Sequence, residues 1–62
     1  MLFGEKIKKI RKEKNMSFNE FANFTGFTPS YIYKLETGKI NPTFKSINQF
    51  CEKLNVPAGY FF

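Results

Sequence analysis

The stretch that decides the fold runs from Ser17 to Gly38 and reads SFNEFANFTGFTPSYIYKLETG. It contains two helix start signals: Ser17 with Glu20 three residues later forms a capping box, and a second N-cap threonine is followed by proline at the first helical position. Gly26 interrupts the first helix, and Gly38 is a C-terminal stop for the second. The sequence therefore predicts two short helices joined by a glycine-containing turn.

Two further helices flank this unit. Phe3, Ile7 and Ile10 recur at i, i+4 and i+7, which predicts an amphipathic helix over roughly residues 3–14. Thr43 caps another helix that extends to about Leu54. The apolar stripe expected on that helix consists of Phe44, Ile47, Phe50, Cys51 and Leu54.

The closing segment, residues 56–62, is predicted to be a short fifth helix or turn in which Tyr60, Phe61 and Phe62 pack on the core. An alternative for these three aromatics is a dimer contact. No segment alternates with strand period. We expect an all-α, compact bundle of four to five short helices that forms a single domain over residues 1–62, with the two-helix unit at about 17–38.

Composition narrows the functional class. The 62 residues carry a formal charge of +5, which favours polyanionic partners, and no apolar run approaches the ~20 residues that span a bilayer. Cys51 is the single cysteine and histidine is absent, so we expect no disulfide, no metal site and no cofactor. Paired carboxylates in a cleft and a glycine-rich phosphate loop are also lacking. We therefore expect neither an enzyme nor a small-molecule site.

The helices of the 17–38 unit need close contact. Ala22 faces the crossing helix, where a larger side chain would separate the two, and Gly26 permits a backbone conformation that a Cβ resists. Burying Ile32 and Leu35 between the helices leaves the opposite face of the second helix exposed. That face carries Pro29, Ser30, Tyr31, Tyr33 and Lys34, which makes these residues candidates for contacting base edges and phosphates.

With these elements in order, the chain resembles the helix-turn-helix domain of phage repressors and Cro proteins, the Xre-like class, over nearly its whole length. The matching segments are Ile7–Arg11, Ser17–Ala22, Gly26–Ser30, Ile32, Leu35–Gly38, Asn41-Pro42 and Leu54–Val56. The resemblance implies a lambda-repressor-like bundle that binds a double-stranded DNA operator, as a homodimer, and regulates transcription as a repressor. It further implies a cytoplasmic, nucleoid-associated protein of bacterial or phage origin, with no membrane partner.

The resemblance also implies roles for individual residues. It places Thr28, Ser30, Tyr31, Tyr33 and Lys34 in or beside the major groove, as part of a helix at about 29–37. It assigns backbone contacts to Ser17, Asn19, Lys39, Asn41, Thr43 and Phe44. It pairs Arg11 with Glu36, so that these two residues, together with Ala22 and Gly26, support the recognition helix.

Two positions depart from the family pattern. Many members have glutamine directly after the first N-cap, where this chain has Phe18, and Asn19 is the nearest polar substitute. Phe24 stands where a polar, solvent-facing residue is usual. Both phenylalanines are either more buried than the pattern suggests or form an apolar patch at a dimer or partner surface.

The competing interpretation is a protein-interaction module, either antitoxin-like or the head of a longer regulator. Several single residues also have an alternative role that involves no DNA contact. In place of DNA contacts, Tyr31 and Tyr33 would be surface aromatics that cover the scaffold, and Cys51 is expected to fill space in the core. The basic cluster is expected to be a solvated face that generates an electrostatic field rather than a set of direct contacts; it consists of Lys6, Lys8, Lys9, Arg11, Lys12 and Lys14.

Overall fold

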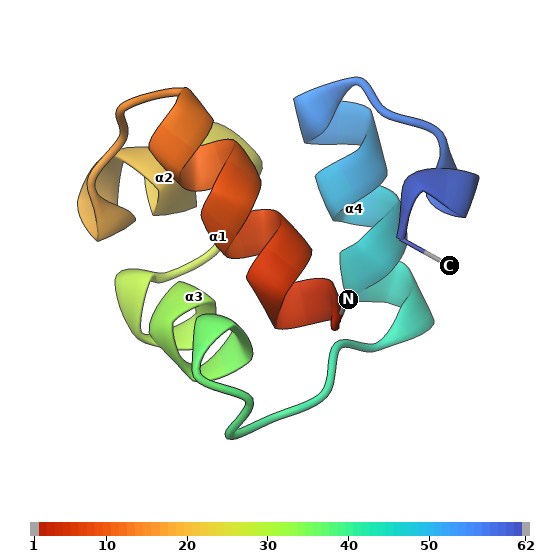
Figure 1. The fold of residues 1–62 in the computed structure, drawn as a ribbon, viewed down its shortest axis with the longest axis horizontal. Helices are drawn as coiled ribbons and strands as arrows, with labels where there is room; N and C mark the ends of the chain where they lie inside the picture. Colours follow the sequence, from red (N-terminus) through yellow and green to blue (C-terminus); the bar gives the residue numbers. More distant parts are fainter. Residues whose placement is uncertain (1, 62) are drawn as a thin grey trace.

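The computed structural model describes residues 2–61, and within that range the chain forms four α-helices and one 3-10 turn but no strand (Figure 1). The elements are α1 (Phe3–Glu13), α2 (Phe18–Thr25), α3 (Pro29–Glu36), α4 (Phe44–Leu54) and the 3-10 turn η1 (Ala58–Tyr60). The expected all-α bundle is confirmed. No helix in residues 2–61 has both the length and the apolar character needed to cross a bilayer.

The start of each later helix is fixed by the cap that the sequence predicts. Ser17 Oγ accepts a hydrogen bond from the Glu20 N–H at 3.1 Å, and the Glu20 carboxylate accepts one from the Ser17 N–H at 2.9 Å. Thr28 and Thr43 cap α3 and α4 in the same way, each accepting an N–H three residues later at 3.1 Å. These bonds satisfy N–H groups that have no partner inside the helix.

The turn between α2 and α3 depends on a left-handed residue. Gly26 has a φ of +84°, a conformation that disfavours any residue with a Cβ. The N–H groups of Gly26 and Phe27 both donate to the Ala22 carbonyl oxygen, at 2.8 and 2.9 Å. The chain therefore leaves α2 in a tight, hydrogen-bonded turn, as the sequence predicts.

The core lies between all four helices. In Figure 1, α1 crosses the view diagonally, with α3 at the lower left and α4 at the right. Phe50 of α4 is completely buried, and its ring lies 4.5 Å from that of Phe27, 5.5 Å from that of Phe3 and 6.3 Å from that of Phe21. The buried apolar residues around it are Ile7, Ile10, Phe21, Ala22, Ile32, Leu35, Ile47, Leu54 and Phe61.

One expectation about α4 is wrong. Phe44 was expected in the apolar stripe, but its side chain is 78% exposed, whereas Ile47 and Phe50 are buried. Periodicity assigns a face to a residue but takes no account of where its helix leaves the bundle. Phe44 is the first residue of α4 and lies beyond the part that other elements cover. Cys51 is half-buried against the core, in line with a filler role.

The C-terminal segment closes the core beside the start of α1. The Phe61 ring is buried and lies 4.7 Å from that of Phe3, while Tyr60 is 38% exposed. Lys6 Nζ donates to the Tyr60 carbonyl oxygen at 2.7 Å. Packing of Phe61 is confirmed, and the expectation for Phe62 lies outside the described residues.

Candidate nucleic-acid interface

The outer face of α3 is open because its inner face is held by the core. Ile32 and Leu35 are 0% and 2% exposed, and they point toward α1 and α2. Ser30, Tyr33 and Lys34 are exposed on the opposite side, as is Thr28 at the N-cap. Four of the five residues predicted to lie at the major groove therefore share an accessible surface.

Tyr31 differs from the other four. Its ring stacks on that of Phe27, with centroids 5.0 Å apart, and its hydroxyl is 2.7 Å from Ser46 Oγ. Because Ser46 belongs to α4, Tyr31 connects α3 to α4. The half-buried side chain thus has a structural partner, and its hydroxyl is already hydrogen-bonded within the protein.

The residues expected to contact the DNA backbone are all exposed and lie in two groups. Ser17 and Asn19 are at the start of α2, and the second group follows α3, comprising Lys39, Asn41, Thr43 and Phe44. The hydroxyls of Ser17 and Thr43 are occupied by the caps, so their N-terminal helix turns are ordered by the protein itself.

An ion pair fixes α3 to α1. Arg11 donates from Nε and Nη2 to the two carboxylate oxygens of Glu36, at 2.7 and 3.0 Å, and from Nη1 to the Met16 carbonyl oxygen at 3.0 Å. The side chains are 12% and 3% exposed, so water screens the pair weakly. The hydrogen bond to Glu36 is the main reason that the pKa of Arg11 is raised above its ordinary value, against a smaller lowering by burial. The pairing that the resemblance implies is present.

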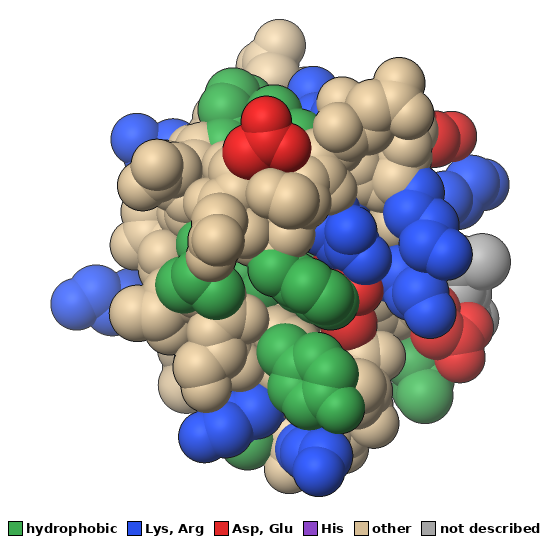
Figure 2. Space-filling model, turned by 90° about the vertical axis from the view of Figure 1, so that its left-hand side faces the viewer, with side chains coloured by type: hydrophobic (Ala, Val, Ile, Leu, Met, Phe, Trp, Pro, Cys, Tyr) green, Lys and Arg blue, Asp and Glu red, His purple; other side chains and the backbone are tan. Residues whose placement is uncertain are grey.

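Phe18 lies next to this ion pair. The Arg11 guanidinium carbon is 4.3 Å from the centre of the Phe18 ring, a cation–π arrangement. The edge-to-face partner of Phe18 is Tyr33 of α3, with centroids 6.0 Å apart and an interplanar angle of 72°. A half-buried ring thus connects the scaffold to the exposed face of α3 at the position where the family often has glutamine. Figure 2 shows apolar and basic side chains side by side on this side of the molecule.

Phe24 is not buried, which rules out the first of the two alternatives for this residue, while its place in a dimer or partner surface stays a prediction. It is 40% exposed, and Lys14 Nζ lies 5.2 Å from the centre of its ring. No other ring among residues 2–61 is paired with it. Phe24 therefore adds an isolated apolar spot to the surface of α2, apart from the Phe18–Tyr33 pair.

Two positioning residues were missed by the sequence analysis. Gln49 of α4 donates from Nε2 to the Thr25 carbonyl oxygen at 2.8 Å, which anchors the turn between α2 and α3. Gly4 lies where α1 approaches the end of α3, and a Cβ at this position would overlap the Leu35 carbonyl. Neither contact has a local signal, because each joins residues more than twenty positions apart.

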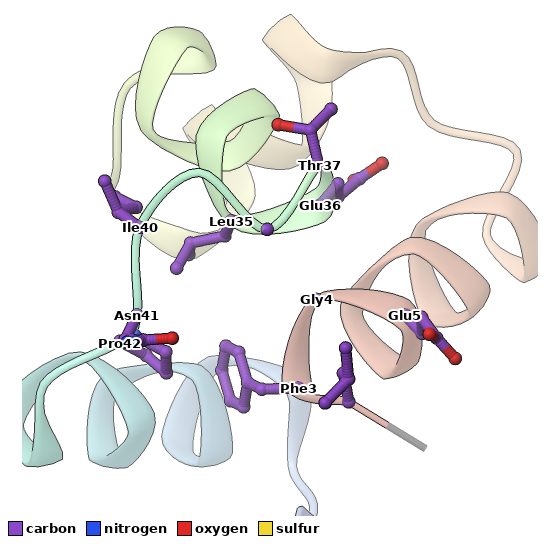
Figure 3. A pocket seen from close by; sticks show the side chains of 11 residues that line it. Phe3, Gly4, Glu5, Leu35, Glu36, Thr37, Ile40, Asn41 and Pro42 are labelled. Carbon is purple, nitrogen blue, oxygen red and sulfur yellow. The ribbon is translucent and has the colours of Figure 1, made fainter.

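A shallow hollow of about 270 Å³ adjoins the Gly4 contact (Figure 3). Its walls come from the start of α1 and from the segment that follows α3, including Phe3, Ile40 and Pro42. Glu36 is at its rim, but the carboxylate is already paired with Arg11. The hollow marks a close helix crossing, and no buried side-chain nitrogen or oxygen atom among the described residues lacks a hydrogen-bond partner.

Basic side chains dominate the rest of α1. Lys8, Lys9, Lys12 and Lys14 are exposed, with Glu5 and Glu13 as the acidic residues of the same helix. Residues 5–14 thus hold six of the ten basic residues of the chain and two of its five acidic residues, so much of the net charge of +5 comes from this segment. A positively charged surface of this kind attracts polyanions and accelerates their encounter with the protein. Residues 2–61 contain no group of three or more potential metal ligands.

Known proteins with similar sequences belong to one family. Residues 4–62 match the family described as "Helix-turn-helix domain". The chain is 34% identical over 59 residues to a Bacillus subtilis protein named "SPbeta prophage-derived uncharacterized HTH-type transcriptional regulator YonR", with 95% of this chain and 55% of the relative covered.

Two other relatives are similarly distant. The chain is 30% identical over 66 residues to the Bacillus subtilis "HTH-type transcriptional repressor RghR", covering 94% of this chain and 49% of the relative. It is 31% identical over 55 residues to the Sinorhizobium fredii "Uncharacterized HTH-type transcriptional regulator y4dJ", covering 89% of this chain and 71% of the relative. The chain thus spans about half the length of the two Bacillus subtilis relatives.

Proposed function

The chain belongs to the helix-turn-helix domain family, and on that basis we propose that it is a sequence-specific DNA-binding domain of a transcriptional regulator, acting as a repressor. In this proposal α3 enters the major groove of double-stranded DNA, and Thr28, Ser30, Tyr33 and Lys34 contact base edges. The observation that carries the proposal is the exposed polar and basic face of a helix whose other face is buried.

The flanking groups fit contacts with the DNA backbone. Lys39 and Asn41 follow α3, while Ser17 and Asn19 precede or begin α2, so the two groups bracket the recognition helix. Side chains and free N–H groups of this kind position a protein on phosphates without reading sequence. The proposed domain binds an inverted repeat as a homodimer and acts in the cytoplasm. The proposal includes no catalytic role.

In-vitro selection from random duplex DNA tests this function directly. Enrichment of a motif supports a sequence-specific domain, and an inverted repeat with half-sites about one helical turn apart, roughly 34–36 Å, supports the dimer. Retention without any enriched motif would contradict sequence-specific binding. No retention at low salt would reject DNA as the partner.

A protein-interaction module remains the second candidate because Phe24 and Phe44 are exposed at 40% and 78%. Salt separates the two functions. Binding through several phosphate contacts loses orders of magnitude in affinity between about 50 and 200 mM salt, whereas an apolar protein interface changes little.

A further inference from the structure

The pairing of Phe18 with Tyr33 gives the candidate interface a chemical property that α3 alone lacks. Phe18 has no hydrogen-bonding side-chain atom, yet it lies at the first position of α2, against the exposed face of the recognition helix. Tyr33 is 48% exposed and meets it edge to face. The half-buried Phe18 ring therefore extends the apolar surface of the Tyr33 ring, which shares the outer face of α3 with Ser30 and Lys34.

This surface is preorganised. The Phe18 ring is held on one side by the Arg11 guanidinium at 4.3 Å, and Arg11 is itself fixed by Glu36 and by the Met16 carbonyl. Each of these contacts exists in the free protein. Because the rings are already ordered, binding costs little side-chain entropy at this surface. Most of the free energy gained from an apolar contact there therefore appears in the binding affinity.

The major groove offers one apolar group, the C5-methyl of thymine, and all other base-edge features there are hydrogen-bond donors or acceptors. The Phe18 ring has no polar atom and cannot form hydrogen bonds with those donors and acceptors. A contact with them would only remove their bound water. We propose that Phe18 and Tyr33 together contact the C5-methyl group of a pyrimidine in the major groove, which is thymine in unmodified DNA. This inference rests on the proposed function and specifies what its site recognises.

The test begins with the enriched duplex from the in-vitro selection. Each thymine is replaced in turn by deoxyuridine, which removes the methyl group and leaves base pairing and O4 unchanged. At the contacted position we expect affinity to fall about fourfold, the value of one buried methyl group. Replacing that thymine–adenine pair by 5-methylcytosine–guanine or by cytosine–guanine then shows whether a methyl group on either pyrimidine is recognised.

Protein variants assign the effect to the two rings. Phe18→Gln and Tyr33→Ser should each bring the thymine-to-uracil affinity ratio close to one, while Tyr33→Phe should preserve it because the ring remains. Phe24→Gln is the matched control, since it removes another phenylalanine from α2 that lies away from the Phe18–Tyr33 pair. The ratio in this control should stay at its starting value.

The outcomes separate the two proposals. A binding motif without thymine, or one in which no uracil substitution weakens binding, overturns the methyl contact and leaves sequence-specific binding intact. A ratio that survives both Phe18→Gln and Tyr33→Ser also overturns it, because another residue then contacts the methyl. If Phe18→Gln fails to fold, the exposed Tyr33 variants decide the assignment. Failure to retain any DNA rejects both proposals.

Discussion

Arg11 donates two hydrogen bonds to the carboxylate of Glu36, at 2.7 and 3.0 Å, and so joins the first helix to the end of the third. The bond is bidentate and the carboxylate is only 3% exposed. Its main consequence is geometric, because it sets the position of α3 relative to a helix that lies outside the helix-turn-helix unit.

Removing one partner should destabilise the fold strongly. Arg11→Met leaves the Glu36 carboxylate buried and unpaired, and we expect the free energy of unfolding to fall by about 3–5 kcal/mol in urea titrations. The double variant Arg11→Met/Glu36→Leu should recover much of the loss, since it removes the buried charge as well. A loss below about 1 kcal/mol in the single variant would mean that the pair is solvated.

The same pair should add no pH dependence from the arginine near neutrality. Glu36 raises the pKa of Arg11, so the stabilisation is complete below the ordinary pKa of arginine and is lost only as the pH rises through the raised value. We expect the stability difference between the native chain and the double variant Arg11→Gln/Glu36→Gln, which leaves no unpaired buried carboxylate, to be flat over roughly pH 6–9. A decline in that difference within this range, measured by urea unfolding, would contradict the assignment.

Gly4→Ala tests the crossing of α1 and α3. Alanine is the better helix former by about 1 kcal/mol, but its Cβ would overlap the Leu35 carbonyl and force the helices apart. We expect a net loss of about 1–3 kcal/mol, read from thermal or urea unfolding. Gly59→Ala is the control, since a Cβ there meets nothing within 4 Å, and it should leave stability nearly unchanged.

Tyr31→Phe separates a structural role from a DNA contact. The variant keeps the stack on Phe27 and removes the hydroxyl that pairs with Ser46. We expect stability to fall by about 0.5–1.5 kcal/mol, with DNA affinity at constant salt changed less than twofold. A large loss of affinity with unchanged stability would instead place the hydroxyl on the nucleic acid.

Two lysines should give different signatures in DNA binding. Lys34→Ala, on the outer face of α3, should cost roughly 1–3 kcal/mol and relax preference at one base position. Lys39→Ala, beyond the end of α3, should weaken all sequences alike and reduce the salt slope by about one unit. Fluorescence anisotropy against the enriched duplex and a scrambled duplex at several salt concentrations measures both effects. An unaltered preference in Lys34→Ala would argue against placing α3 in the groove.

Local chemistry made most of the fold predictable. Ser17 with Glu20, Thr28 and Thr43 are caps whose hydrogen-bond partners lie within three residues, and Gly26 ends α2 through its own backbone conformation. Such features can be recognised in a sequence because they need no distant partner. The Arg11–Glu36 pair came from the family resemblance rather than from spacing.

The parts that the sequence left open depend on distant contacts. Gln49 reaches back to Thr25, and the significance of Gly4 depends on the backbone at Leu35. Phe44 was assigned to the apolar stripe of its helix because helical period alone cannot show which turn of the helix the bundle covers. Which residues touch DNA stays a prediction, since exposure makes a contact possible but does not select it.

Phe50 of α4 is a packing partner shared by several parts of the chain. Its ring meets rings from α1, from α2 and from the turn before α3, so these three parts of the chain pack on one residue of α4. We expect a peptide of residues 17–38 alone to lose that common partner and, with it, the packing of α2 and of the turn that leads into α3. The outer positions of α3 are free of this constraint. Under the proposed function, we expect that exchanging those few surface residues in the intact domain changes the DNA sequence preference, whereas transplanting the two-helix unit alone does not.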